Sequence, residues 1–291
     1  MMRLSGAEVA QSLELRLREE VAKLRQQGCV PTLAVIQVGD NPASQSYVRS
    51  KLKTAERLGI RTRNVDLPAT AAQAEGAARV TGLNRDPDVH GILCQLPLPP
   101  QLDAEAIVQG IEPLKDVDGL TAANMGRLAL GNPRFVPCTP AGILEMLRHY
   151  RLPVAGRVAV VIGRSNIVGR PLSILLSQRD WNATVLLCHS QSPELAEWTR
   201  RADLVVAAVG IPEFVTAGMV RDGAVVVDVG INRVADPTRP KGYRLCGDVA
   251  YDAVAPKCLA ITPVPGGVGP MTVTMLMDNT VKAARLQSAG A

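Results

Sequence analysis

The sequence predicts an α/β protein with two domains, the second of which contains a parallel sheet. The chain of 291 residues is long enough for one large or two ordinary domains, and its 47% hydrophobic content can fill two cores. Its C-terminal half contains valine-rich, largely apolar runs at residues 158–162, 203–209 and 224–229. Such runs are typical of strands buried on both faces, as in parallel sheets. We place the domain boundary near residues 118–139.

The N-terminal half shows a second pattern, in which helical and strand periods alternate. Ser5 and Glu8 form a capping box, and apolar residues then recur at helical spacing until Gly28. The segments that follow predict a strand at 32–38, a helix at 43–58, a strand at 62–67, a helix at 71–83 and a strand that begins at Gly91. This order predicts an α/β domain for the first half of the chain.

The predicted strand at 158–162 runs into a turn bounded by glycines. Gly163 allows the chain to turn sharply, so that the next helix can begin beneath a phosphate group. The spacing Gly163-x-Ser165-x-x-x-Gly169 is one residue longer than the G-x-G-x-x-G fingerprint of dinucleotide-binding turns, and serine replaces the second glycine. Two interpretations remain open: a dinucleotide-binding turn, or a plain strand-to-helix turn of an α/β domain.

The next predicted strand, at 183–188, favours a dinucleotide site and NADP over NAD. An NAD site usually has Asp or Glu at the end of this strand, where the ribose binds. Here the strand is followed by His189 and Ser190, and Arg164 lies in the preceding turn. Guanidinium and hydroxyl groups bind a 2′-phosphate, whereas a carboxylate would repel it.

Composition argues against several other classes of protein. The formal net charge is +5, but the 32 basic and 27 acidic residues are scattered, so we expect no nucleic-acid partner. The six cysteines contain no C-x-x-C pair and the three histidines lie far apart, so we expect reduced thiols and no metal site. The N-terminus lacks an apolar signal core and no stretch approaches ~20 apolar residues, so we expect no membrane segment and a cytoplasmic location.

Three polar residues of the first half are candidates for chemistry. Tyr47 and Lys51 are spaced i, i+4 on a predicted helix and therefore share a face. The pair is also compatible with a solvated lysine stem that lies over a tyrosine ring. Gln95 interrupts an apolar run, and a buried amide needs partners, so it either binds nearby backbone or points into a site.

Later loops carry further candidates. The segment Lys115-Asp116-Val117-Asp118 could bind a cation, orient a substrate or form an Asx-type turn. Thr139 and Pro140 predict the N-cap and the first residue of a helix that ends near residue 150. Residues 260–270 are rich in proline and glycine, which predicts a rigid loop before a last helix at 271–285. We expect that helix to pack on the first domain.

Six motifs, in order along the chain, resemble those of the bifunctional methylenetetrahydrofolate dehydrogenase/cyclohydrolase family. They are Tyr47-Val-x-x-Lys51, Gln95-Leu-Pro-Leu-Pro, Lys115-Asp-Val-Asp118-Gly, Pro140-x-Gly142, Gly163-Arg-Ser-x-x-Val-Gly-x-Pro171 and Pro263-Val-Pro-Gly-Gly-Val-Gly-Pro-Met-Thr272. The resemblance implies a catalytic, folate-binding domain at residues 1–138, completed by residues 271–291. It also implies a Rossmann-like NADP-binding domain at residues 139–270, a folate cleft between the two domains, and a homodimer.

The resemblance further implies roles for individual residues, position by position. The family's catalytic positions match Tyr47, Lys51, Gln95 and Asp118, and Asp118 corresponds to the aspartate that holds the pterin ring. Its substrate-binding positions add Cys94, Leu96, Pro265, Gly266 and Gly267, and its cofactor-contacting positions match Gly163, Arg164, Ser165, Ser190 and Ile231. The family often has Val where this chain has Cys94, and Thr where it has Ser192, and these differences bear on cofactor affinity rather than on the chemistry.

By this resemblance the protein oxidises 5,10-methylenetetrahydrofolate to 5,10-methenyltetrahydrofolate with NADP, and hydrolyses the product to 10-formyltetrahydrofolate. These reactions belong to tetrahydrofolate interconversion, which serves purine, methionine and histidine biosynthesis. One alternative is another two-domain NADP oxidoreductase, such as a shikimate-dehydrogenase-like enzyme. It would explain the turn at Gly163 but not the four catalytic matches. The other alternative is a nucleotide sensor without catalysis.

Overall fold

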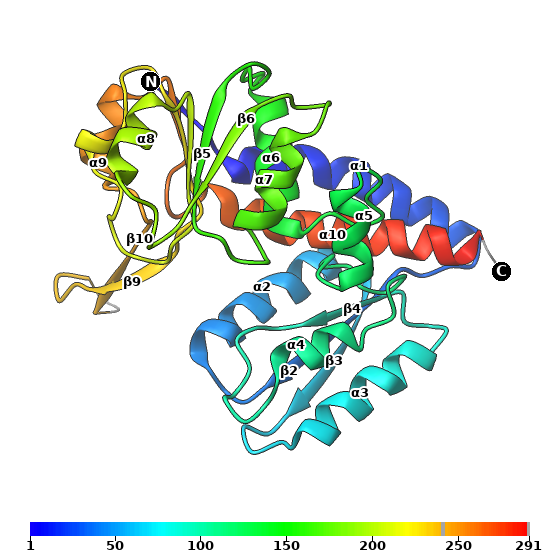
Figure 1. Ribbon diagram of the computed structural model, residues 1–291. Helices are drawn as coiled ribbons and strands as arrows, with labels where there is room; N and C mark the ends of the chain where they lie inside the picture. Colours follow the sequence, from blue (N-terminus) through cyan, green and yellow to red (C-terminus); the bar gives the residue numbers. More distant parts are fainter. Residues whose placement is uncertain (240–241, 290–291) are drawn as a thin grey trace. The chain divides into compact units, whose positions relative to one another are not determined.

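The protein folds into two compact units, each with a parallel sheet (Figure 1). The computed structural model describes residues 1–239 and 242–289. The first unit comprises Gln11–Cys138 and the chain from Val273 onward, and the second comprises Met1–Ala10 and Thr139–Thr272. The prediction of a two-domain α/β protein is confirmed. The first ten residues, which were expected in the N-terminal domain, group with the second unit instead.

The first unit is built on three parallel strands in the order β3 (Arg61–Leu67), β2 (Thr32–Val38) and β4 (Gly91–Cys94). Every residue of the central strand β2 is buried, which accounts for its apolar, β-branched sequence. Helices α3 (Gln73–Arg85) and α4 (Ala104–Gln109) cover one face of the sheet, through a core that includes Ile36, Val80 and Ile107. Helix α2 (Pro42–Leu58) lies on the other face (Figure 1).

The second unit is built on a six-stranded parallel sheet. Its strand order is β1 (Met2–Arg3), β11 (Ala260–Ile261), β8 (Val225–Asp228), β7 (Leu204–Ala207), β5 (Val158–Ile162) and β6 (Thr184–Cys188). From β6 to β11 this is the order 2-1-3-4-5 of doubly wound α/β sheets. In such sheets a ligand binds where the strand order reverses, which here is outside the carboxyl ends of β5 and β7.

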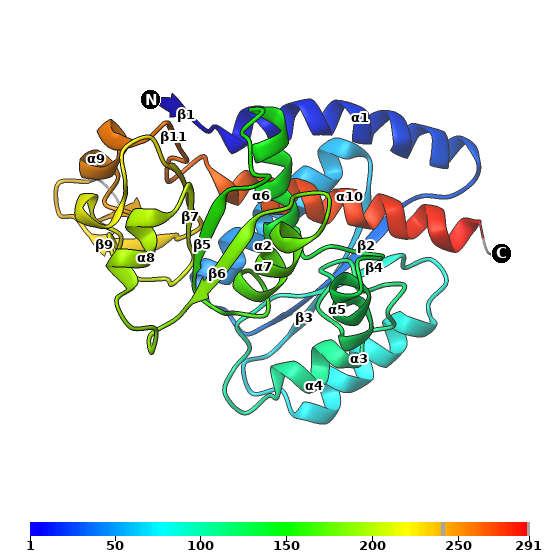
Figure 2. The same cartoon turned by 45° about the horizontal axis from the view of Figure 1, so that its top comes forward.

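Helices cover both faces of the second sheet. Helices α6 (Cys138–His149) and α7 (Gly169–Ser177) lie on one face, and α8 (Leu195–Arg201) and α9 (Tyr251–Val254) lie on the other (Figure 2). Four short elements complete this unit: the 3-10 turns Ala217–Met219 and Ala255–Lys257, and the antiparallel hairpin of β9 (Asn232–Ala235) and β10 (Tyr243–Cys246). These elements are too short for their sequences to show a period, and the sequence did not predict them.

Three further helices are α1 (Gly6–Gln26), α5 (Ala122–Ala129) and α10 (Val268–Ser288). In the first unit α1 and α10 are joined by an ion pair between Arg16 Nη2 and Asp278 Oδ1, at 2.9 Å. The last helix begins at Val268 rather than at the predicted Met271. Pro270 therefore lies in its first turn, where a missing amide hydrogen costs no intrahelical bond.

The predicted cap of the sixth helix is wrong. We expected Thr139 to be the N-cap and Pro140 the first helical residue, but α6 begins at Cys138. Thr139 is therefore already in the first turn, and its hydroxyl lies 3.0 Å from that of Thr272. Helix ends commonly differ by one or two residues from the sequence pattern, and here the Thr139 hydroxyl links α6 to α10.

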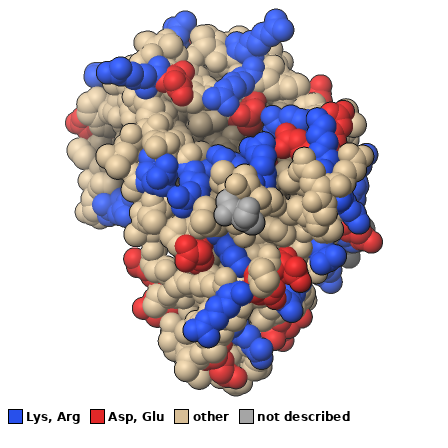
Figure 3. All heavy atoms as spheres, turned by 90° about the vertical axis from the view of Figure 1, so that its right-hand side faces the viewer, with Lys and Arg blue, Asp and Glu red and all other residues tan. Residues whose placement is uncertain are grey.

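The distribution of charge can be followed on one face of the molecule. On the face drawn in Figure 3, Lys and Arg side chains are interspersed with Asp and Glu side chains. Within residues 1–239 and 242–289, no helix is both long enough and apolar enough to cross a membrane.

Candidate active site

Lys51 is a buried lysine on helix α2. Its side chain is 9% exposed, and its Nζ donates a hydrogen bond to Oε1 of Gln95 at 2.8 Å. Burial lowers the pKa of the Lys51 amine below its usual value, and the charges of Asp118 and then Cys138 oppose this effect. The alternative of a solvated lysine stem is therefore wrong for Lys51.

Gln95 follows the last residue of β4 and connects the sheet to Lys51. Its backbone N–H donates to the carbonyl of Ile36 at 2.9 Å, which extends the pairing of β4 with β2 by one residue. Its amide oxygen accepts from Lys51, and its Nε2 donates to the carbonyl of Leu96 at 2.7 Å. The amide of Gln95 thus binds nearby backbone, as one of the two alternatives predicted, and also holds the buried amine of Lys51.

Two charged residues of the loop at 115–118 bind to neighbouring parts of the first unit. Lys115 Nζ donates to two backbone carbonyls, those of Leu83 and Asp86. The Asp116 carboxylate accepts from the backbone N–H and the hydroxyl of Thr121 and from Nδ2 of Asn124. Lys115 and Asp116 therefore hold the loop itself, as the Asx-type alternative predicted.

Asp118 differs from its neighbours because its charge acts on Lys51. Burial raises the pKa of the Asp118 carboxyl above its usual value, and the positive charge of Lys51 and a hydrogen bond from the Cys138 thiol oppose that rise. Lys51 and Asp118 come from separate segments of the first unit, a helix and a loop. Each charge acts on the pKa of the other group, and ionisable groups with perturbed pKa values gather at functional sites.

Two thiols lie beside this pair. Burial raises the pKa of the Cys94 thiol to about 11, with a smaller contribution from the charge of Asp118. Burial also raises the pKa of the Cys138 thiol well above its usual value, and again Asp118 adds to the effect. Both cysteines are therefore neutral thiols near pH 7 and are unsuited to act as nucleophiles.

The structure places the other predicted substrate residues as follows. Tyr47 lies one turn before Lys51 on α2 with a side chain that is 39% exposed, and Leu96 is half-buried. Pro265, Gly266 and Gly267 belong to the second unit, where the Gly266 carbonyl accepts from the backbone N–H of Gly6 at 3.0 Å. The loop is thus attached to the first residue of α1.

The turn after β5 requires glycine at both ends. Gly163 has a φ of 113°, and a Cβ at this position would collide with the carbonyl oxygen of Ala208, the residue that follows β7. A Cβ at Gly169 would collide with the carbonyl of Gly163 itself. The turn therefore folds tightly onto its own backbone at the point where the strand order reverses, and α7 begins directly from it.

This geometry predicts a specific stability effect. We expect Gly163→Ala to lower the free energy of unfolding by ~2–4 kcal/mol, because strained backbone and a steric collision add together. Gly223→Ala is the matched control: its φ is 76° and no atom lies within 4 Å of the added Cβ, so only ~1–2 kcal/mol of backbone strain is expected. Thermal unfolding of both variants measures the difference, and equal losses would contradict the collision.

The remaining predicted cofactor residues lie near this turn or near other strand ends of the same sheet. Arg164 and Ser165 are exposed in the turn, and Ser165 Oγ accepts from the backbone N–H of Val168 at 3.2 Å. Ser190 is exposed after β6, the neighbour of β5. Ile231, which follows β8 and Gly230, is 42% exposed. A phosphate would therefore meet a guanidinium and hydroxyl groups at adjacent strand ends.

Ser192 has a local role that the sequence could not show. Its Oγ accepts from the backbone N–H of His189 at 2.9 Å, and its own N–H donates to the His189 carbonyl at 2.9 Å. The hydroxyl thus shapes the turn that presents Ser190. A serine at this position fulfils that task as well as a threonine would.

Two family models match the chain, one in each half. Residues 4–118 match the tetrahydrofolate dehydrogenase/cyclohydrolase catalytic domain, and residues 137–288 match the NAD(P)-binding domain of the same family. The chain belongs to the tetrahydrofolate dehydrogenase/cyclohydrolase family. It is therefore an enzyme with dehydrogenase and cyclohydrolase activities, and the predicted family is confirmed.

Relatives of known name match over the full length. Bifunctional protein FolD 1 of Myxococcus xanthus is 50% identical over 283 residues, which cover 97% of each chain. The crystal structure of the bifunctional FolD enzyme of Campylobacter jejuni is 44% identical, with a TM-score of 0.93 over 98% of this chain and 99% of the other. The FolD structure of Trypanosoma brucei, a complex with NADP cofactor and an inhibitor, is 41% identical, with a TM-score of 0.95 over 100% of this chain and 99% of the other.

For this member of the tetrahydrofolate dehydrogenase/cyclohydrolase family, sequence reasoning missed two residues beside the predicted site. Cys138 is buried against Asp118, and Asn279 donates hydrogen bonds to the backbone of two nearby loops. Cys138 directly precedes the Thr139-Pro140 pair, so its place in a motif offered a signal. Asn279 lies on a helix more than a hundred residues away, and its helical pattern offered none.

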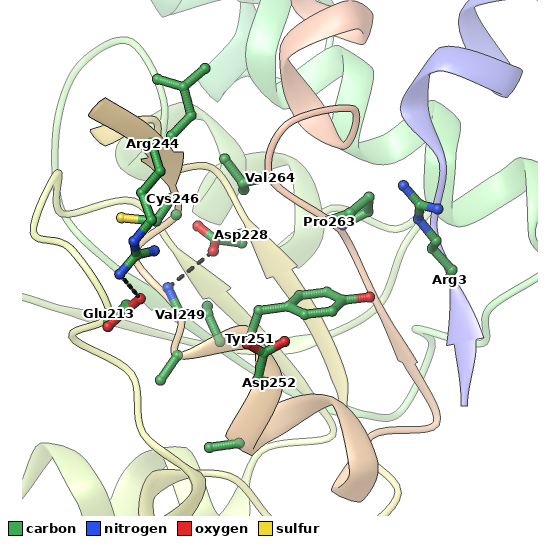
Figure 4. A pocket seen from close by; sticks show the side chains of 14 residues that line it. Arg3, Glu213, Asp228, Arg244, Cys246, Val249, Tyr251, Asp252, Pro263 and Val264 are labelled. Atoms are coloured by element: carbon green, nitrogen blue, oxygen red, sulfur yellow. Dashed lines mark hydrogen bonds and ion pairs between the residues drawn. The ribbon is translucent and has the colours of Figure 1, made fainter. Parts of the chain in front are cut away.

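A cavity of about 570 Å³ in the second unit does not coincide with the residues matched to the family's site (Figure 4). Its lining includes Arg3, Asp228, Arg244 and Tyr251, together with Pro263 and Val264 from the start of the last matched motif, but none of the residues matched to a catalytic, substrate-binding or cofactor-contacting position. Burial raises the pKa of the Asp228 carboxyl to about 6, although that carboxyl accepts from three backbone N–H groups. Its hydrogen bonds hold neighbouring loops, so this acid has a structural role.

Among the described residues, no group of three or more His, Cys, Asp or Glu side chains could hold a metal ion. In the loop at 115–118, the carboxylate of Asp116 accepts hydrogen bonds from Thr121 and Asn124.

Proposed function

We propose that this protein oxidises 5,10-methylenetetrahydrofolate to 5,10-methenyltetrahydrofolate with NADP, and hydrolyses the product to 10-formyltetrahydrofolate. Both family models and the named FolD relatives support these reactions. The observation that carries the proposal is the buried Lys51 amine, held by a neutral amide and coupled to Asp118. That arrangement supplies the proton acceptor that hydrolysis needs.

The oxidation step needs positioning rather than a base. When hydride leaves the methylene carbon, the two nitrogen atoms that flank the carbon stabilise the resulting cation. The protein must therefore hold the pterin ring in an orientation that directs the methylene carbon toward the hydride acceptor. We assign this task to Asp118, whose carboxylate can accept two parallel hydrogen bonds, one from a ring N–H and one from an exocyclic amine.

The hydrolysis step needs proton transfer by the protein. Water that attacks the methenyl carbon must lose a proton, and the departing nitrogen must later gain one. An ordinary lysine, with a pKa of about 10.4, would be cationic at neutral pH. Burial lowers the pKa of Lys51, and the neutral amide of Gln95 fixes the amine without favouring the ammonium form as a carboxylate would. Tyr47, one turn back on α2, orients Lys51 or relays the proton.

The turn after β5 fits a dinucleotide. Gly163 and Gly169 leave a tight backbone cradle that any side chain would fill, and α7 begins directly beneath it. We propose that the cofactor is held by Gly163, Arg164, Ser165, Ser190 and Ile231. When bound, NADP supplies the hydride acceptor. The NADP complex of the Trypanosoma brucei relative supports this choice.

One assay separates this function from the two alternatives. The protein is mixed with 5,10-methylenetetrahydrofolate and NADP, and NADPH formation and loss of methenyltetrahydrofolate are followed by absorbance. We expect both signals. A shikimate-dehydrogenase-like enzyme would give neither signal with folate but would reduce NADP with a different substrate, and a sensor would bind NADP without turnover.

Arg164 provides a test of cofactor choice. We expect Arg164→Ala to raise the KM for NADP roughly ten- to a hundredfold, about 1.4–3 kcal/mol, because a charge-assisted contact to the 2′-phosphate is lost. The use of NAD should barely change. Arg170→Ala is the control, since Arg170 is also exposed near this turn but bonds to Asn166 at 2.8 Å. If NAD and NADP suffer equally, Arg164 is structural.

We also propose a division of labour between the two domains, a cellular location, an oligomeric state and a metabolic role. The division of labour would assign folate binding and catalysis to residues 1–138 with 271–291, and NADP binding to residues 139–270. All six cysteines are free thiols, which is typical of a reducing compartment and supports a cytoplasmic location. The family resemblance supports a homodimer and a role in purine, methionine and histidine biosynthesis. Sedimentation of the purified protein tests the dimer.

A further inference from the structure

Asn279 ties two separate loop segments of the first unit together. It lies on α10 with 5% of its surface exposed, and its Nδ2 donates to the carbonyl of Val117 at 2.8 Å and to the carbonyl of Val136 at 3.0 Å. Both acceptors are backbone atoms. A single side-chain amide therefore bridges segments that are 19 residues apart in sequence.

These two segments carry the groups that surround the Asp118 carboxylate. Val117 directly precedes Asp118, and Val136 lies two residues before Cys138. The Cys138 thiol lies beside the Asp118 carboxylate, and its Sγ is 3.5 Å from the Val117 carbonyl oxygen, so both acceptors surround one S–H group. The bridge made by Asn279 thus ends on the backbone at one side of Asp118.

The contact between the segments is close enough for a small displacement to matter. Gly119, directly after Asp118, has a φ of 72°, and a Cβ there would lie 3.1 Å from the backbone nitrogen of Pro137. No side chain separates the two backbones at this point. Asp116 holds the loop through hydrogen bonds to Thr121 and Asn124. Loss of the Asn279 bridge would therefore leave the loop folded, but the Val117 carbonyl would lose the hydrogen bond that holds it in place.

We propose that Asn279 is a positioning residue, which holds the backbone before Asp118 so that the Asp118 carboxylate meets the pterin ring of the folate substrate. The inference rests on the role proposed for Asp118. We expect no direct contact between Asn279 and the substrate. Its effect should appear in the binding of folate and not in the binding of NADP, because its acceptors belong to the first unit and the proposed cofactor residues to the second.

The test compares Asn279→Leu with Thr280→Val. Leucine has a similar size to asparagine but no donor, so both carbonyls lose their hydrogen bond. Thr280 is the next residue, is fully buried, and uses its hydroxyl within α10, where it donates to the carbonyl of Leu276 at 2.7 Å. Thr280→Val therefore removes one buried hydrogen bond from the same helix and leaves both hydrogen bonds of Asn279 in place.

We expect Asn279→Leu to raise the KM for 5,10-methylenetetrahydrofolate about tenfold. This is the effect of weakening one hydrogen bond between the displaced Asp118 carboxylate and the pterin ring. The KM for NADP should stay within twofold, and Thr280→Val should change neither value. If Asn279→Leu fails to fold, Asn279→Ala, which leaves a small cavity instead, carries the same expectation.

A wild-type folate KM in a folded Asn279 variant would overturn the inference, and so would an equal rise in Thr280→Val. Asp118→Ala is measured in parallel. If Asp118→Ala binds folate normally, the proposed role of Asp118 fails as well. If Asp118→Ala is impaired but the Asn279 variant is normal, only the positioning role fails.

Discussion

Lys51→Met is expected to abolish cyclohydrolase activity while measurable dehydrogenase activity survives, so that methenyltetrahydrofolate accumulates. Methionine keeps the length and the apolar stem of lysine but cannot accept a proton. Loss of a general base costs roughly 10²- to 10⁴-fold in rate, whereas the hydride step needs no base from the protein. The absorbance of methenyltetrahydrofolate during the coupled reaction measures the outcome directly.

The pH dependence of cyclohydrolase activity provides a second test of the role of Lys51. The active form of Lys51 is the neutral amine, so activity should rise as the pH increases through the pKa of Lys51 and fall as the amine is protonated. Because burial lowers that pKa, this limb should lie at a lower pH than for an ordinary lysine. Lys53→Met, an exposed lysine on the same helix, is the control and should retain both activities. A wild-type pH limb in Lys51→Met would contradict the assignment.

Asp118→Ala is expected to lose folate binding and both activities together. Two charge-assisted hydrogen bonds to the pterin ring are removed, each worth about 1.5–3 kcal/mol. The affinity for folate should therefore fall roughly 10²- to 10⁴-fold. Titration with tetrahydrofolate measures the change, and an unchanged affinity for NADP shows that the second unit is intact.

Asp118→Asn serves as the matched variant for this test. Asparagine has the same shape and keeps one carbonyl acceptor, so it should bind folate more tightly than alanine and less tightly than aspartate. Removal of the negative charge should also lower the pKa of Lys51 further, because Asp118 opposes the effect of burial on that amine. An Asp118→Ala protein with normal folate affinity would refute the pterin assignment and return the loop to a structural role.

The sequence predicted the secondary structure well where a period ran over several turns or strand residues. The strands at 32–38 and 158–162 were predicted with the observed limits. The two-residue strand β1 was missed, since Met2 and Arg3 form a strand only because Ala260 and Ile261 lie beside them. The start of α6 was also misplaced by one or two residues, and the contact of Thr139 with Thr272, far along the chain, could not be read from the local sequence.

The sequence was limited in the same way for the candidate site, because features that depend on distant parts of the chain could not be predicted. Helical spacing put Tyr47 and Lys51 on one face, but it could not reveal that one side chain is 39% exposed and the other 9%. Asp116 and Asp118 stand two residues apart with the same chemistry, and only the positions of Thr121 and Asn124 separate the loop-forming acid from the one coupled to Lys51. Burial and long-range partners are properties of the folded chain, which no local pattern encodes.

The uneven burial of the cysteines makes the protein convenient to label. Five of the six thiols are buried, and burial raises the pKa of each of them, so few thiolates are available to react with a maleimide. Cys29, just after α1, is the partly exposed sixth. A fluorophore can therefore be attached at Cys29 in the unmodified sequence, while the thiols next to Asp118 stay unreacted and the residues proposed to bind folate stay intact.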